Sequence, residues 1–217
     1  TINENKLEDL DFERGNQEQR KSNIYKAVVT RIEPSLEAAF VNYGVDRHGF
    51  LPFKEISPDL YSKKSRKKSI SIKDVMTEGQ EIVVQVNKDE RGNKGAALTT
   101  YLSLAGRYIV LMPNNKDGGG ISRRVEGEER AQFKEVLSQV KVKKGMSVIG
   151  RTAGIGASVE EIQWDLDYLN QLWAAIAGAA EAQSGAFLIY QESNLVVRAI
   201  RDYFNTDIEE IIIDKQS

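Results

Sequence analysis

The chain has 217 residues, of which 41% are hydrophobic and 29% charged, ordinary values for a soluble protein with room for two modest domains. It has no cysteine and one histidine, His48, which excludes disulfides and thiolate metal sites and leaves little basis for a His-rich metal centre. The net charge of −2 means that any binding to nucleic acid has to come from local basic clusters, and no apolar run approaches the length of a membrane-spanning helix.

The first 23 residues are polar, with no signal-peptide pattern, and a short Leu7, Leu10, Phe12 pattern there allows one strand. Beyond them, β-branched runs and turn residues predict five strands. Five strands in which the third connection is longer than the others are typical of an OB-type barrel. The strands are Ile24–Ile32, Leu36–Tyr43, His48–Phe53, Gln80–Asn87 and Gly95–Thr100.

The third connection, residues 57–73, carries the basic cluster Lys63–Lys68. We interpret it first as a solvated surface loop, with a phosphate-gripping loop as the alternative.

After Thr100 the pattern alternates between strands and amphipathic helices, which predicts a second, α/β domain. Ser158 followed by Glu161 forms a capping box at the start of a long helix. The predicted strands are 107–112, 121–125, 147–151, 187–190 and 208–213, and the predicted helices are 128–140, 158–182 and 194–204.

Two features of the sequence suggest contact with nucleic acid. Phe40 and Phe50 lie on adjacent strands near His48 and Lys94, and OB-type barrels stack bases on such rings, although each Phe alone is better explained as core. The turn RTAGIG, from Arg151 to Gly156, offers backbone N–H groups, a hydroxyl and an Arg fork for an anion. From the pattern alone an ordinary strand-to-helix loop is the better interpretation.

The acidic residues do not assemble a reaction centre. Asp165 and Asp167 share a helix but point to different faces, which makes them a poor metal pair. Asp9 and Asp11 alternate on one strand face, where they either hold a metal or form a solvated edge.

Several long strings resemble the N-terminal region of the ribonuclease E/G family of bacterial endoribonucleases: NIYKAVVTRIEPSLEAAFVNYG, HGFLPFKEI, ERGNKGAALTT, YIVLMPNN, GGISRR, RTAG and RAIRDYF. NKGAALTT and LMPNN favour its ribonuclease E branch. The resemblance covers nearly the whole chain and implies an α+β architecture. It assigns 21–102 to an S-one type OB-fold RNA-binding domain and 103–196 to a 5′ sensor, with partial RNase-H-like segments at 1–20 and 197–217.

The resemblance also implies the residues that contact RNA. Arg151 and Thr152 would hold a 5′-terminal monophosphate, in a pocket too small for a triphosphate. The sensor residues are Gly106, Val110, Arg123, Arg151 and Thr152. The barrel residues are Phe40, Phe50, Lys88 and Lys94, to which the residue pattern adds His48.

No catalytic residue, metal site or cofactor is assigned within the chain. In the family, Mg²⁺-binding aspartates and a zinc-linking cysteine motif lie in later domains. We therefore expect this chain to bind single-stranded RNA and sense its end without cutting it. The longer protein would be a cytoplasmic, homotetrameric endoribonuclease of RNA processing and mRNA decay, with scaffold partners.

Two other functions fit the same sequence. A generic single-strand binder would have no end preference, and Arg151 would then be structural. An assembly module would use the helix of Trp164 and Trp173, or the RNase-H-like strands, as a protein-binding surface, although Trp on an amphipathic helix is usually core.

Overall fold

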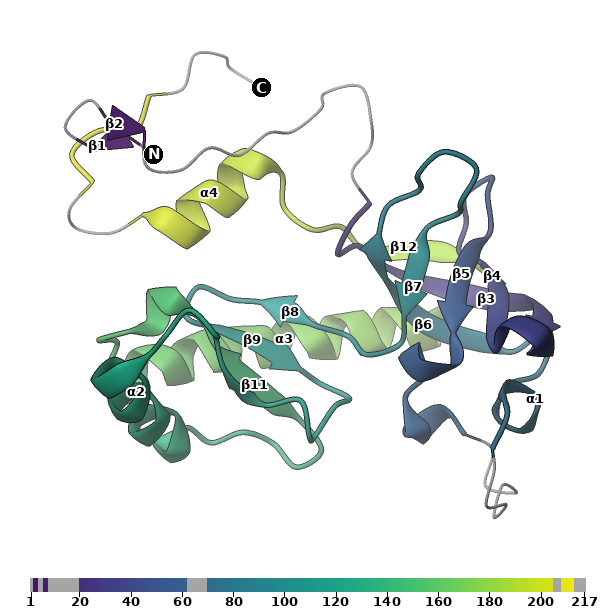
Figure 1. The fold of residues 1–217 in the computed structure, drawn as a ribbon, viewed down its shortest axis with the longest axis horizontal. Helices are drawn as coiled ribbons and strands as arrows, with labels where there is room; N and C mark the ends of the chain where they lie inside the picture. Colours follow the sequence, from purple (N-terminus) through teal and green to yellow (C-terminus); the bar gives the residue numbers. More distant parts are fainter. Residues whose placement is uncertain (1, 4–5, 8–19, 62–69, 205–207, 213–217) are drawn as a thin grey trace. The chain divides into compact units, whose positions relative to one another are not determined.

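The computed structural model describes residues 2–3, 6–7, 20–61, 70–204 and 208–212 (Figure 1). The chain divides into two compact units, Gln19–Glu192 and a smaller one made of Thr1–Glu18 and Ser193–Ser217. The smaller unit contains the antiparallel pair β1 (Ile2–Asn3) and β2 (Lys6–Leu7) together with helix α4 (Leu195–Tyr203).

A closed five-stranded barrel forms the first half of the large unit, which confirms the predicted OB-type fold. Closure follows from β3, which pairs with β4 on one side and with β6 on the other. The strand order is β3-β4-β5-β7-β6, and only β5 and β7 run parallel. The strands are β3 (Ile24–Glu33), β4 (Ala38–Asn42), β5 (Gly49–Pro52), β6 (Glu81–Lys88) and β7 (Ala97–Thr99).

Alternate side chains on these strands point into the barrel, as the period of a strand requires. Val41, Leu51 and Val84 are fully buried there. Gly49 permits tight packing, because a Cβ at that position would lie 2.4 Å from the Leu98 side chain. The connection from β5 to β6 contains η2 (Phe53–Glu55), η3 (Pro58–Leu60) and α1 (Ile72–Val75). The basic cluster Lys63–Lys68 and the acid pair Asp9 and Asp11 lie outside the described residues.

The second half of the large unit is a four-stranded sheet in the order β10-β11-β9-β8, with β10 and β11 parallel. Helix α3 packs against β8, β9 and α2, and Figure 1 shows it running behind the sheet toward the barrel. The elements are β8 (Leu104–Ala105), β9 (Ile109–Met112), β10 (Gly120–Ile121), α2 (Gly127–Gln139), β11 (Ser147–Gly150), η4 (Thr152–Gly154) and α3 (Val159–Ala182).

Helix α3 begins at the predicted capping box. The Ser158 hydroxyl accepts from the Glu161 amide at 3.2 Å, and the Glu161 carboxylate accepts from the Ser158 amide at 2.8 Å. The backbone hydrogen bond from Ser158 lowers the pKa of Glu161. Ile162, Leu166 and Leu169 are fully buried along one face of this helix.

Three expectations about the fold are wrong. The strand predicted at 121–125 is confined to β10, Gly120–Ile121, and residues 122–125 form a turn instead. Trp164 is 71% exposed rather than core, because it lies on the opposite side of α3 from the Ile162–Leu166 row, whereas Trp173 is half-buried. Residues 208–212 form no strand, although their β-branched side chains suggested one, since no strand in the described part of the chain pairs with them.

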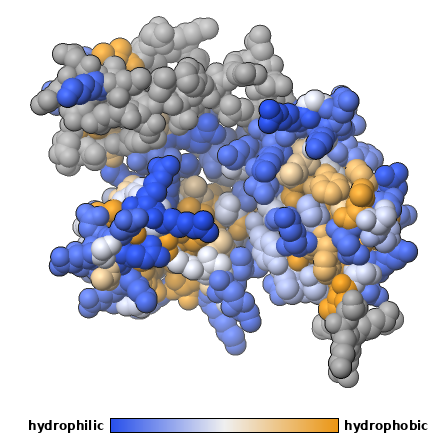
Figure 2. All heavy atoms as spheres, viewed as in Figure 1, coloured by the Kyte–Doolittle hydropathy of each residue, from blue (hydrophilic) through white to orange (hydrophobic). Residues whose placement is uncertain are grey.

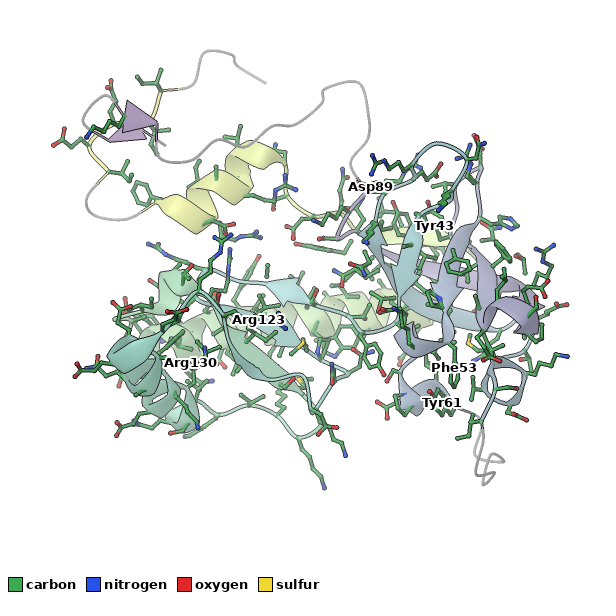
Figure 3. All side chains as sticks on the ribbon, viewed as in Figure 1. Tyr43, Phe53, Tyr61, Asp89, Arg123 and Arg130 are labelled. Carbon is green, nitrogen blue, oxygen red and sulfur yellow. The ribbon has the colours of Figure 1, made fainter. Side chains whose placement is uncertain are left out.

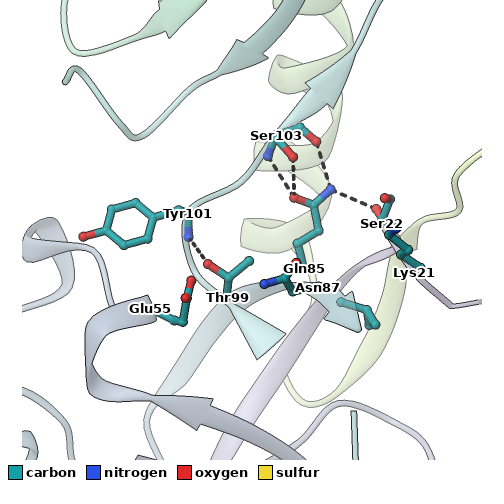
Figure 4. A pocket seen from close by; sticks show the side chains of 9 residues that line it. Lys21, Ser22, Glu55, Gln85, Asn87, Thr99, Tyr101 and Ser103 are labelled. Atoms are coloured by element: carbon teal, nitrogen blue, oxygen red, sulfur yellow. Dashed lines mark hydrogen bonds between the residues drawn. The ribbon is translucent and has the colours of Figure 1, made fainter. Parts of the chain in front are cut away.

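Two polar junctions join the barrel to the second half. Strand β12 (Phe187–Tyr190) follows α3 and pairs with β3, while Lys26 Nζ donates to the carbonyls of Ala180 and Gln183 at 2.8 and 2.6 Å. Gln85 lies beside a cavity of about 240 Å³ (Figure 4). Its amide nitrogen donates to the Ser22 and Ser103 carbonyls at 2.9 Å, and its oxygen accepts from the Ser103 amide at 2.8 Å.

Candidate nucleic-acid interface

One outward-facing row of side chains crosses all five barrel strands. Residues paired in adjacent strands share a face, and the pairings Arg31↔Phe40, Phe40↔Phe50, Phe50↔Ala97 and Ala97↔Lys88 connect β3, β4, β5, β7 and β6 in turn. The three central residues are half-buried, and Arg31 and Lys88 at the ends are exposed. We call these five residues the barrel row.

The two rings of the barrel row lie on the outer surface, not in the core. Their neighbours Ala39, Val41 and Leu51 are the residues that point inward. The ring centroids of Phe40 and Phe50 are 5.9 Å apart at 64°, an edge-to-face pair. In Figure 2 the barrel carries a hydrophobic patch bordered by hydrophilic side chains, the combination expected of a base-stacking surface.

A shallow groove of about 380 Å³ lies beside Phe40 and is lined by Thr30, Arg31, Phe40 and His48. Arg31 lies over the Phe40 ring, with Cζ 4.6 Å from the centroid. The Thr30 hydroxyl donates to the Phe40 carbonyl at 3.0 Å and lies 3.1 Å from His48 Nδ1. The groove thus combines an aromatic face, a cation and polar groups within one nucleotide's reach.

Lys94 stands on the hairpin that joins β6 to β7, and its side chain is exposed. The hairpin closes through reciprocal backbone hydrogen bonds between Arg91 and Lys94 of 3.0 and 3.1 Å. Its backbone passes directly over the loop of His48, because a Cβ on Gly95 would lie 2.3 Å from the His48 carbonyl oxygen. Lys94 and His48 are therefore neighbours, although 46 positions separate them in the sequence.

Glu90 ties this hairpin to the rest of the barrel. Its carboxylate lies 3.2 Å from Arg20 Nη1 and 3.7 Å from Arg47 Nη1, and it accepts from the Tyr43 hydroxyl at 3.3 Å. Burial and the Glu90 charge raise the pKa of Tyr43 to about 12. Arg47 also donates to the Gly92 carbonyl at 2.7 Å. Figure 3 shows Tyr43 and Asp89 at this end of the barrel.

The second candidate site lies on the four-stranded sheet. Ala105, Val110 and Ile149 are paired across β8, β9 and β11, and all three are half-buried, whereas Ile109 and Leu111 on either side of Val110 are fully buried. Val110 therefore belongs to a small apolar surface on the face opposite to the core. Arg151, half-buried, follows two residues after Ile149 at the end of β11.

The turn after Arg151 differs from the expected set of free backbone donors. The amides of Gly154, Ile155 and Ala157 all donate to carbonyls within the turn. Gly154 is buried, and a Cβ there would lie 2.6 Å from the Phe133 ring, so its small size serves packing. Beside these amides, the side chains that the turn offers an anion are the Arg151 guanidinium and the exposed Thr152 hydroxyl.

Gly106 and Arg123 lie close to Arg151. Arg151 Nη1 donates to the Gly106 carbonyl. The Ser122 amide donates to the Gly150 carbonyl at 2.8 Å, which places the exposed Arg123 beside the end of β11. The loop of Arg123 is held by Arg130 from α2, whose Nη1 donates to the Ser122 and Val125 carbonyls at 3.0 and 3.2 Å (Figure 3).

The structure thus gathers the five predicted sensor residues at one end of the sheet and the five predicted barrel residues on one face of the barrel. Sequence reasoning missed Thr30, Arg31, Ala105 and Ile149. Knowledge of the strand pairing would have identified Arg31, Ala105 and Ile149, because each is paired with a predicted residue. In the described ranges, no group of three or more His, Asp or Glu side chains can hold a metal ion, and no helix is both long and apolar enough to span a bilayer.

Comparison with known proteins finds two family matches. Residues 18–100 match the S1 RNA binding domain, and residues 103–217 match the Ribonuclease E/G family. The chain is 58% identical over 213 residues to Ribonuclease E of Escherichia coli (strain K12) and to that of Haemophilus influenzae; each match covers 96% of this chain, but 20% and 22% of those proteins. It is 33% identical over 215 residues to Ribonuclease G of Escherichia coli (strain K12), which covers 97% of this chain and 44% of that protein. The chain thus spans about a fifth of the length of the two ribonuclease E relatives.

Proposed function

Since this chain belongs to the ribonuclease E/G family and contains an S1 RNA-binding domain, we propose that it grips single-stranded RNA on the barrel row and recognises a 5′-monophosphate end at Arg151. The family membership confirms the resemblance seen in the sequence. The observation that carries the RNA-binding part of the proposal is the barrel row itself, in which strand pairings link two aromatic rings to Arg31 at one end and Lys88 at the other.

On the barrel, each part of the row has a separate task. Bases stack on the faces of Phe40 and Phe50, and this contact tolerates any sequence because every base has a π face. Arg31 and Lys88 neutralise phosphates on either side, while Lys94 and His48 extend the same surface. Arg31 lies over the Phe40 ring, with Cζ 4.6 Å from the centroid, so its guanidinium has to move aside for a base to stack on that face.

On the sheet, the end of the RNA is read by a small set of groups. The Arg151 guanidinium and the Thr152 hydroxyl bind the terminal phosphate, and Arg123 adds positive charge beside them. The apolar row around Val110, together with Gly106, supports the terminal nucleoside. A monophosphate fits these groups and a 5′-hydroxyl leaves the Arg151 contact unmade, while weaker binding of a triphosphate is what the resemblance to the family implies.

For the longer protein, we propose a bacterial, cytoplasmic endoribonuclease of RNA processing and decay, on the strength of the Ribonuclease E relatives. Cleavage with Mg²⁺, zinc-linked assembly into a homotetramer and binding of scaffold partners are part of the same proposal. Within this proposal, the described residues of this chain hold the RNA and select its end.

The test is a binding titration of one short single-stranded RNA with either a 5′-monophosphate or a 5′-hydroxyl. An Arg–phosphate contact contributes about 1.5–3 kcal/mol, so we expect a preference of about tenfold or more for the monophosphate. Arg151→Ala should abolish the preference. Lys144→Ala is the matched control, because it removes one positive charge before the start of β11, at the opposite end of that strand from Arg151.

Equal binding of the two RNAs by the wild-type chain would leave a generic single-strand binder, the main alternative. Concentration-dependent self-association without RNA binding would favour the assembly module instead.

A further inference from the structure

The turn between β8 and β9 is held by a side chain from a distant helix. The Asp165 carboxylate on α3 accepts hydrogen bonds from three consecutive amides, those of Arg107 at 3.1 Å, Tyr108 at 2.8 Å and Ile109 at 3.1 Å. Consecutive amides turned toward one point form an anion-binding nest. Here the anion is part of the chain itself, 56 to 58 residues further along the sequence.

The same turn provides the backbone acceptors beside Arg151. The Gly106 carbonyl accepts from Arg151 Nη1, and the Tyr108 carbonyl accepts from the Arg151 amide at 2.8 Å. A Cβ on Gly106 would lie 2.5 Å from both carboxylate oxygens of Asp165, so a larger residue there would displace the carboxylate. The carboxylate, the turn and the guanidinium therefore form one connected chain of contacts.

Asp165 is itself rigidly placed. Its neighbours on α3, Ile162, Leu166 and Leu169, are fully buried, and the capping box fixes the start of the helix. A side chain anchored in this way can transmit the position of the helix to the turn, since three hydrogen bonds to one carboxylate leave the turn little freedom.

We propose that Asp165 is a positioning residue for 5′-end recognition, which fixes the Gly106–Ile109 turn and through it aims the Arg151 guanidinium at a terminal monophosphate. This inference rests on the proposed function of Arg151. The effect that positioning predicts for removal of Asp165 is opposite to the effect that its charge predicts. By charge alone a carboxylate near the pocket repels the phosphate, so its removal would strengthen phosphate binding. By positioning, its removal weakens the preference.

Asp167 supplies a matched control. It lies on the same helix two residues on, is exposed, and accepts a hydrogen bond from Gln163 Nε2 at 2.9 Å rather than from the turn. Asp167→Asn thus removes the same charge from the same helix and leaves the nest intact.

The experiment measures the dissociation constants of a short single-stranded RNA with a 5′-monophosphate and with a 5′-hydroxyl. The proteins are the wild type, Asp165→Asn, Asp165→Ala and Asp167→Asn. We expect a wild-type preference of about tenfold or more to fall below about threefold in both Asp165 variants. Affinity for the 5′-hydroxyl RNA, which reports on the barrel, should stay unchanged, and Asp167→Asn should keep the preference. The isosteric Asn variant serves if the Ala variant does not fold.

Gly106→Ala gives a second readout that does not depend on RNA. Because its added methyl group meets the Asp165 carboxylate, it should lower the melting temperature more in the wild type than in the Asp165→Ala background. A wild-type preference that both Asp165 variants retain, or a preference that increases in them, overturns the positioning role and leaves the proposed function standing. No preference in the wild type overturns both.

Discussion

The barrel row and the Arg151 site, the two places where we propose that RNA binds, are built by different means. The barrel row is built from side chains that strand pairing places in register, and its rings and cations face outward from a rigid scaffold. The Arg151 site is built from turns, and its guanidinium is oriented by a carbonyl of another turn. Side chains aligned by strand pairing can contact RNA of any sequence. Turns held together by hydrogen bonds are suited to recognising one chemical group, such as a terminal phosphate.

The largest effect should come from removing both rings of the barrel row. Each base stacked on an aromatic ring contributes about 1–3 kcal/mol. Phe40→Ala with Phe50→Ala should therefore weaken binding of either RNA by about 30-fold or more, while the ratio between the two RNAs stays the same. Fluorescence anisotropy measures both quantities. Leu36→Ala removes an exposed apolar side chain outside the row and should change neither. A ratio that collapses with the rings would show that the two sites are not separate.

The cations at the ends of the barrel row should appear in the salt dependence. Each phosphate contact to a single strand contributes a slope of about −0.7 in a plot of log affinity against log salt. Arg31→Ala and Lys88→Ala should each reduce the slope by about that amount, measured with the 5′-hydroxyl RNA. Lys144→Ala removes an exposed positive charge that lies before β11, outside the barrel strands, and should leave the slope unchanged.

Those features of the fold and of the two sites that depend on residues close together in the sequence could be predicted from it. Alternation of side chains located the barrel strands, and Ser158 with Glu161 marked the start of α3. Phe40, Phe50 and Lys88 of the barrel row were predicted, but Arg31 and Ala97 were not, because register shifts between Val29 and Arg31 and between Val86 and Lys88 decide which residues align. The Asp165 nest was missed for a similar reason, since its donors lie more than 50 residues away.

Glu90, whose contacts tie the Lys94 hairpin to the rest of the barrel, should have a smaller effect on RNA affinity. The direction of the change distinguishes positioning from charge. Glu90→Gln removes a negative charge near the RNA surface, so charge alone predicts tighter binding. Loss of the contacts to Arg20, Arg47 and Tyr43 loosens the hairpin of Lys94 and predicts weaker binding, by on the order of threefold. Asp46→Asn removes a charge from the same region without touching these contacts. Tighter binding by both variants would show that Glu90 positions nothing.

The smallest effect concerns acid stability at the junction of the two halves. A hydrogen bond from Lys26, and then one from the Gly185 amide, lower the pKa of Glu81 below its ordinary 4.5. A lowered folded-state pKa stabilises the protein above 4.5, and this stabilisation is lost as the pH falls through the folded-state value. Glu81→Gln should therefore lose less melting temperature than the wild type between pH 6 and pH 3.5, measured by circular dichroism. If the melting temperatures of the two proteins fell in parallel with pH, the contacts of Glu81 to Lys26 and Gly185 would not contribute to stability at the junction.

The most direct test of two separate grips is the ratio of the dissociation constants for 5′-hydroxyl and 5′-monophosphate RNA in the wild type, Phe40→Ala and Arg151→Ala. We predict a ratio of about ten or more that survives Phe40→Ala with both affinities weakened, and a ratio near one in Arg151→Ala with the 5′-hydroxyl affinity preserved. A ratio near one in the wild type, or one that Phe40→Ala abolishes and Arg151→Ala does not, would contradict the account.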